Sequence, residues 1–173
     1  MSPVASMRSN TAAESADDLK SLYQEIILDH GKSPRNLRVV DHATCTAKGN
    51  NPMCGDKVSV SARVSPAGVI EDIAFEGRGC AISIASASMM TTALKGRTVD
   101  SARRLFNAVQ GLCTGKTELA AAKADTPDAD DALDQLAALS GVRQFPVRVK
   151  CATLPWHALV SCLDGTATAT TET

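Results

Sequence analysis

The chain has 173 residues, a formal net charge of −1 and 44% hydrophobic residues, which suits a single domain with its own core. No clustered basic face is visible, so the composition argues against nucleic acid as a partner. No apolar run approaches the roughly 20 residues that span a bilayer, and the N-terminal stretch lacks a signal-peptide core. We therefore expect a cytoplasmic protein that does not enter a membrane.

The N-terminal part predicts a tail followed by a helix. Residues 1–16 are small and polar, and we expect them to be disordered. Ser15 with Asp18 three positions later resembles a capping box. An apolar face at helical spacing follows it, made of Leu19, Leu22, Tyr23, Ile26 and Ile27. The helix should end near His30-Gly31.

Residues 43–96 predict strands and then a helix. A short strand is expected over 43–48, and apolar and polar residues alternate over 58–65 as in a half-buried strand. The SPAG turn at 65–68 returns the chain as a hairpin partner over 69–76. After a glycine-rich corner, residues 82–95 predict a helix that Gly96 ends.

The second half predicts helices. Thr98 could cap a helix that extends to about Leu112. The Ala- and Asp-rich stretch at about 114–132 is interpreted as a mobile insertion with partial helix. A short helix is expected over 133–139. The segment QFPVRVK is taken as extended up to Cys151, and Pro155 as part of the first turn of a last helix.

These elements predict an α+β fold, with a small antiparallel β-sheet packed against a cluster of helices. One domain is expected over 17–163, followed by a disordered tail over 164–173.

The six cysteines fall into two groups. Since we expect a reducing compartment, a disulfide framework is not predicted. Three cysteines sit inside predicted elements, where a thiol packs as a small hydrophobe: Cys45, Cys113 and Cys162. The other three lie at junctions between an extended segment and the next element: Cys54, Cys80 and Cys151.

In the stretch NPMCGD, Gly55 separates Cys54 from Asp56. The pair could be turn chemistry, or it could supply two ligands to one metal ion. Zinc accepts thiolate and carboxylate ligands in tetrahedral geometry, so three thiols and one carboxylate would suit it. However, no Cys-x-x-Cys occurs. Spacing alone therefore leaves both interpretations open.

Four stretches resemble the SufU proteins, a branch of the IscU/NifU-like iron–sulfur assembly family: LYQEIILDHGKSPRN, NPMCGD, FEGRGCAISIASASMM and FPVRVKCATLPW. The resemblance covers about Leu19 to Leu163. It implies the same fold, with one zinc ion per chain. It also implies the four ligands, which would be Cys54, Asp56, Cys80 and Cys151.

Two features favour the SufU branch over scaffold-type relatives. Those relatives carry a histidine directly before the third cysteine of the set, where this chain has Lys150. They are also more compact between the second and third cysteines, whereas this chain has the extra stretch after Gly111.

The resemblance implies a zinc-dependent sulfurtransferase. Such a protein accepts persulfide sulfur from a SufS-type cysteine desulfurase and delivers it to a downstream iron–sulfur assembly scaffold. We assign the acceptor role to Cys54, which lies on a glycine-flanked loop. Arg148, three residues before Cys151, is a candidate contact for the partner or the anionic persulfide, although a solvated surface role is also open.

Two alternatives use the same residues. An IscU-like scaffold would assemble a [2Fe–2S] cluster on these cysteines, because iron–sulfur clusters also take thiolate ligands. A structural zinc-binding interaction module would instead need the metal in order to fold.

Overall fold

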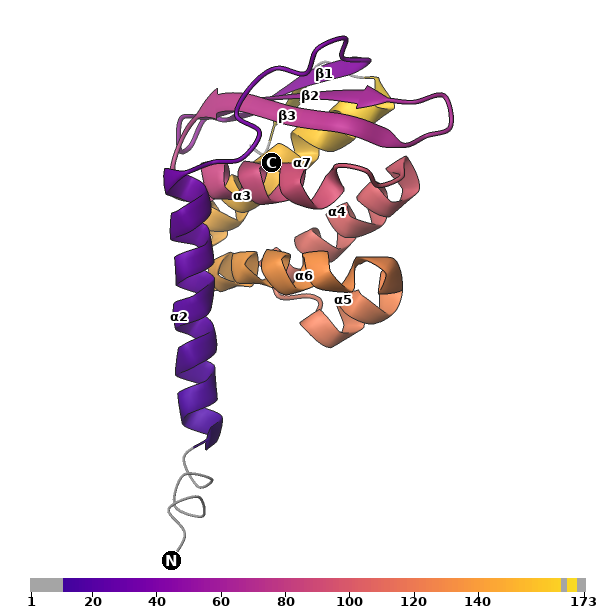
Figure 1. Cartoon of the computed structure of the whole chain (residues 1–173). Helices are drawn as coiled ribbons and strands as arrows, with labels where there is room; N and C mark the ends of the chain where they lie inside the picture. The colour runs from indigo at the N-terminus through magenta and orange to yellow at the C-terminus, as the bar shows by residue number, and fades with distance from the viewer. Residues whose placement is uncertain (1–10, 166–167, 171–173) are drawn as a thin grey trace, which may run out of the picture.

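The computed structural model describes residues 11–165 and 168–170. The remaining residues of the two expected tails, 1–10, 166–167 and 171–173, lie outside this part of the chain. Helix α2 (Thr11–Lys32) begins four residues before Ser15, the predicted cap, and ends close to the predicted position. Of its predicted apolar face, Tyr23, Ile26 and Ile27 pack against the core. Leu19 and Leu22, from the same face, are exposed, so the prediction was wrong for these two residues. In Figure 1 the helix runs along the side of the molecule and projects beyond it at its N-terminal end.

Three strands form the antiparallel sheet that the alternating patterns predict. β1 (Cys45–Asn51), β2 (Asp56–Val64) and β3 (Ile70–Arg78) follow one another as hairpins. A short strand that was not predicted, β4 (Thr168–Thr170), pairs parallel to β1 at the edge. The predicted α+β class is confirmed.

Helices cover one face of this sheet. α3 (Ala81–Leu94) packs under β3, and α7 (Pro146–Asp164) packs under β1 and β2 (Figure 1). α4 (Val99–Thr114) packs against α7 on the side away from the sheet. Thr98 caps α4 as predicted, because its hydroxyl accepts the Ser101 N–H at 3.1 Å.

The segment expected to be a mobile insertion with partial helix is largely helical in the structure. It contains α5 (Leu119–Asp125), a short 3₁₀ turn (Pro127–Ala129) and α6 (Asp130–Leu136), followed by a 3₁₀ stretch (Ala137–Gln144). Ala122 and Ala129 of this segment are buried in the core. Leu133, Leu136 and Leu139, from the stretch predicted as a short helix, are buried there as well. The mobility of the segment stays a prediction.

The extended reading of QFPVRVK was wrong, because α7 begins at Pro146. Alternating Val147 and Val149 suggested a strand, yet Pro146 occupies the first helical turn, where its missing N–H costs nothing. Phe145 before it is extended, as a residue preceding proline usually is. Pro155, predicted for the first turn, lies inside the helix instead.

α7 runs along β1 in the opposite direction. Gly49 makes this close approach possible, because a side chain there would lie within 3.0 Å of Leu154. At the start of β1, Cys45 forms a disulfide with Cys162 near the end of α7. The prediction that both would pack as free thiols was therefore wrong. The two residues are 117 apart in sequence, so only the pairing of these elements brings them together.

Candidate metal centre

The hairpin loop between β1 and β2 carries two of the predicted ligands. Asn51 and Asp56 are paired at the ends of the two strands, so residues 52–55 form the loop between them. Gly55 adopts a φ of 70°, in the left-handed region that side chains rarely enter. This turn leaves Cys54 half-buried and places Asp56 at the first position of β2, where its side chain is fully buried.

The corner between β3 and α3 carries Cys80. It precedes the first turn of α3, as predicted, and its backbone N–H donates to Asp56 Oδ1 at 2.8 Å. Its thiol lies 3.9 Å from the other carboxylate oxygen, Oδ2. Gly79 is required beside it, because a Cβ atom there would collide with the Asp56 carboxylate.

Cys151 lies in the second turn of α7 and is fully buried. Its sulfur is 3.3 Å from that of Cys54 and 3.8 Å from Asn51 Nδ2. Asn51 was missed from the sequence. It is fully buried, and its side-chain oxygen also accepts the Met53 N–H at 3.3 Å, so it joins the loop to α7. The Asn-Pro dipeptide at 51–52 marks a turn and was the available signal.

The structure brings three of the predicted ligands into one cluster and places the fourth at its edge. Ligand atoms of Cys54, Asp56 and Cys151 all lie within 4.8 Å of one another. Cys80 stands outside that triangle but contacts Asp56. Burial raises the pKa of the Cys151 thiol, and hydrogen bonds with Asp56, Cys54 and Cys80 raise it further.

Arg148 lies one helical turn before Cys151, on the same face of α7. The negative charge of a Cys80 thiolate raises the pKa of the Arg148 guanidinium, with further contributions from a hydrogen bond to Cys80 and from Cys151 and Cys54. Its side chain is exposed. The cluster thus has a permanent positive charge beside its sulfur atoms, on the solvent side.

The donor set suits zinc. It combines soft thiol sulfurs with one hard carboxylate oxygen, and zinc accepts both in a single tetrahedral shell. Asp56 is a fully buried carboxylate that faces the Cys80 thiol, which is an arrangement that a cation would neutralise. Cys113, the remaining free thiol, is buried in the core, and burial raises its pKa to about 12.

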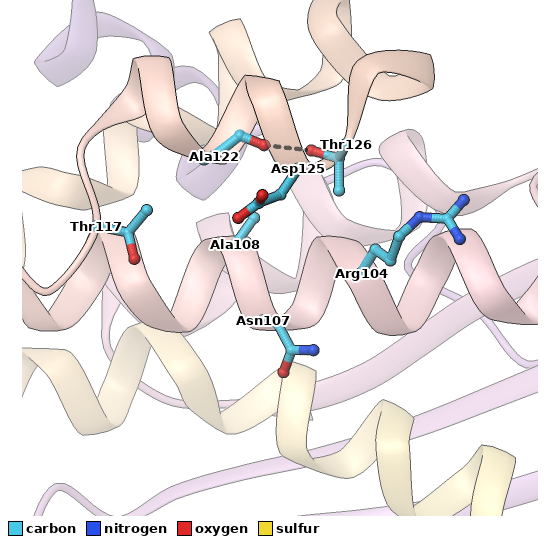
Figure 2. Close-up of a pocket in the computed structure, with 7 residues that line it drawn as sticks. All are labelled: Arg104, Asn107, Ala108, Thr117, Ala122, Asp125 and Thr126. Atoms are coloured by element: carbon cyan, nitrogen blue, oxygen red, sulfur yellow. Dashed lines mark hydrogen bonds between the residues drawn. The ribbon is translucent and has the colours of Figure 1, made fainter.

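A pocket lies between α4 and α5, away from the cysteines (Figure 2). It measures about 310 Å³, and Thr126 at its rim donates to the Ala122 carbonyl at 2.6 Å. The charged residues among those lining it are Arg104 and Asp125. It contributes nothing to the thiol cluster.

Comparison with known proteins gives a consistent result. The NifU-like N-terminal domain family matches residues 22–152. The zinc-dependent sulfurtransferase SufU of Bacillus subtilis is 40% identical over 144 residues, which cover 82% of this chain and 89% of that protein. The iron–sulfur cluster assembly scaffold protein IscU of Streptococcus pyogenes is 36% identical over 151 residues, covering 87% and 88%.

Solved structures agree with the fold. The chain is similar to a proposed iron–sulfur cluster assembly scaffold protein of the SUF system from Fervidobacterium islandicum, with a TM-score of 0.70 and 29% identity. The alignment covers 80% of this chain and 94% of that one. No helix in the described part of the chain is long and apolar enough to cross a membrane.

Proposed function

The chain belongs to the family of NifU-like N-terminal domains, and on that basis we propose that it is a zinc-dependent sulfur acceptor in iron–sulfur cluster assembly. The observation that carries the proposal is the cluster of Cys54, Asp56 and Cys151, whose ligand atoms lie within 4.8 Å of one another. One zinc ion per chain would be held by these residues together with Cys80. When bound, zinc would keep the cysteine ligands deprotonated at neutral pH.

Cys54 is the acceptor in this proposal. It lies on a loop and is half-buried, whereas Cys151 is buried within a helix and Cys80 is fixed through its backbone N–H to Asp56. A Cys54 thiolate attacks the terminal sulfur of a persulfide on a partner cysteine desulfurase. One sulfur–sulfur bond forms as the partner's bond breaks, so Cys54 gains the persulfide and the partner recovers its thiolate. No net oxidation or reduction takes place.

The partners follow from this step. A SufS-type desulfurase would supply the sulfur, and a downstream iron–sulfur assembly scaffold would receive it. Arg148 is proposed as the contact for the persulfide anion, because its guanidinium lies beside Cys80 at the solvent side of the cluster.

The test follows sulfur from cysteine, in the presence of a desulfurase, onto the zinc-loaded protein. Peptide mapping by mass spectrometry should show one added sulfur atom at Cys54 in the wild type. It should show none in Cys54→Ala, with transfer unchanged in Cys113→Ala, since Cys113 is buried in the core, where its thiol contacts the Leu139 carbonyl. Sulfur found first on Cys80 or Cys151 would overturn the assignment of Cys54.

A second candidate function is an IscU-like scaffold that assembles a [2Fe–2S] cluster on the same thiols. The similarity to the Streptococcus pyogenes scaffold favours it. Elemental analysis of protein isolated without oxygen separates the two functions. One zinc per chain without iron supports sulfur transfer, whereas iron with sulfide supports the scaffold.

A further inference from the structure

The stretch LYQEIILDHGKSPRN, residues 22–36, takes no part in the thiol cluster. It forms the end of α2 and the loop that follows, and α2 packs on α3. His30 lies in the last turn of α2 with only 9% of its surface exposed, and Ser88 on α3 is fully buried. The His30 Nδ1 atom is 2.7 Å from Ser88 Oγ, so a buried hydrogen bond joins the two helices.

The bonds around Ser88 show which nitrogen of His30 carries the proton. Ser88 Oγ accepts the backbone N–H of Arg35 at 2.8 Å. Among the hydrogen bonds of the described residues, His30 Nδ1 is the only acceptor for the proton of the Ser88 hydroxyl. The neutral ring therefore accepts at Nδ1 and holds its own proton on Nε2. A second ring proton would have to enter at Nδ1, where it would leave the Ser88 proton without an acceptor.

The surroundings of His30 oppose this second proton. Burial lowers the pKa of His30, and the positive charge of Arg35 lowers it further, whereas Asp29 acts in the opposite direction. Lys32, in the same turn, is exposed. α3 has no charged side chain, and the 3₁₀ stretch that also packs on α2 has only Arg143, which forms an ion pair elsewhere.

We propose that the His30–Ser88 pair is a pH-sensitive switch for the docking of α2 onto α3, which holds when His30 is neutral and releases α2 when the ring takes up a proton. The loop moves with the helix, because Asn36 Nδ2 donates to Thr91 Oγ1 on α3 at 3.1 Å, beside the Ser88 contact. Docking is strongest above the usual histidine pKa of about 6.5 and weakens as the pH falls below it, since the released histidine binds the proton more tightly than the docked one. The inference does not depend on the proposed zinc function.

Hydrogen exchange of the α2 amides tests the switch. It is followed by NMR on zinc-saturated protein at about pH 7.5 and about pH 5.5, as protection factors that correct for the intrinsic effect of pH. In the wild type the protection of α2 should fall by up to about tenfold, because a free histidine at about pH 5.5 is roughly ten times more often charged than neutral. His30→Asn keeps an acceptor oxygen near the position of Nδ1 but cannot take up a proton, so its α2 protection should not change with pH.

His157→Asn is the matched control. His157 on α7 is a partly buried histidine that packs edge-on against Phe106, and burial lowers its pKa as well. This variant should keep the wild-type pH dependence of α2 protection. Any effect of pH on zinc binding is common to all three proteins, so the difference between them reports His30.

Two results would overturn the inference. One is an equal loss of α2 protection in the wild type and His30→Asn, or no loss in either. The other comes from the wild type alone, which keeps the test decisive if His30→Asn does not fold. The His30 ring signal should titrate below about pH 6.5, and a midpoint at or above that value would show that docking does not oppose its protonation.

Discussion

Gly79, the residue before Cys80, packs so closely against Asp56 that it leaves no room for a side chain. Its backbone does not need the left-handed region, so an alanine could adopt the same conformation. The added methyl group would nevertheless collide with the Asp56 carboxylate. We expect Gly79→Ala to displace Asp56 and to lower zinc affinity by about tenfold or more, the size of effect seen when support for a metal ligand is lost. Titration with a competing chelator measures it.

The matched control is Gly141→Ala, because a Cβ atom at Gly141 meets nothing within 4 Å. This variant should bind zinc as the wild type does. If Gly79→Ala bound zinc equally well, Asp56 would not be a ligand in its present position.

Replacing Arg148 tests the role of positive charge at the same centre. Its guanidinium is exposed and lies beside the Cys80 sulfur. Arg148→Ala should therefore leave zinc content unchanged and slow sulfur transfer from the desulfurase by about tenfold, the low end of electrostatic rate effects. The loss should shrink as salt is added, because salt screens exposed charges.

Transfer rates at several salt concentrations make this measurement. Arg63→Ala removes the same charge from β2, where Arg63 pairs with Glu71, and should have little effect. Equal slowing in both variants would indicate a general effect of net charge rather than a contact at the centre.

Among the elements, those with a regular pattern were predictable and the irregular ones were not. β2 and β3 followed from alternating residues and a turn, and α4 followed from Thr98 and its apolar face. The start of α7 was not predicted, since Val147 and Val149 alternate as in a strand although Pro146 begins a helix. Arg148 was nevertheless a candidate from the sequence, and the helix explains why it lies on the same face of α7 as Cys151.

The disulfide that joins β1 to α7 leads to a prediction about stability. The disulfide between Cys45 and Cys162 closes a separation of 117 residues, which restricts the unfolded chain strongly. Reducing it should lower the free energy of unfolding by about 2–5 kcal/mol. Urea unfolding with and without a thiol reductant, on the zinc-loaded protein, measures this difference.

A variant with Cys45→Ala and Cys162→Ala provides the control. It should unfold like the reduced wild type and should not respond to reductant. Wild-type stability that is independent of reductant would show that the bond contributes nothing in solution. Since the centre lies at the opposite end of the same β1–α7 contact, zinc affinity should change little in this variant.

At the scale of the whole molecule, the centre is assembled from three distant segments at one end of the sheet. The hairpin loop brings Cys54 and Asp56, the β3–α3 corner brings Cys80, and α7 brings Cys151. No spacing within the sequence could show that these residues meet, because the distances between them are set by tertiary packing. The resemblance to a family, rather than any local pattern, supplied the ligand set. Asn51 belongs to no such motif of ligands and became visible only through its burial and its contacts with Met53 and Cys151.

Removal of zinc tests whether the protein needs the metal in order to fold or only for the sulfur-accepting site. The core extends from the sheet through α3 and α7 to α4, with Phe75, Met90, Leu105 and Trp156 fully buried. A structural zinc can supply roughly 10–16 kcal/mol to a small domain that has little core of its own. Here the apo protein should stay folded, with an unchanged far-ultraviolet circular dichroism spectrum. Its free energy of unfolding should be lower by about 2.7 kcal/mol than that of protein at a zinc concentration 100-fold above the dissociation constant.

Cys54→Ala should behave in the same way, being folded and cooperative while unable to accept sulfur. Chelation followed by denaturant unfolding, repeated after zinc is restored, makes the measurement and shows whether the change is reversible. Loss of the folded spectrum on chelation would make zinc a structural element, and the chain would then be a zinc-dependent interaction module. Because such a module needs a closed ligand shell, it would also lose its fold in Cys54→Ala, so the two experiments must agree for either function to stand.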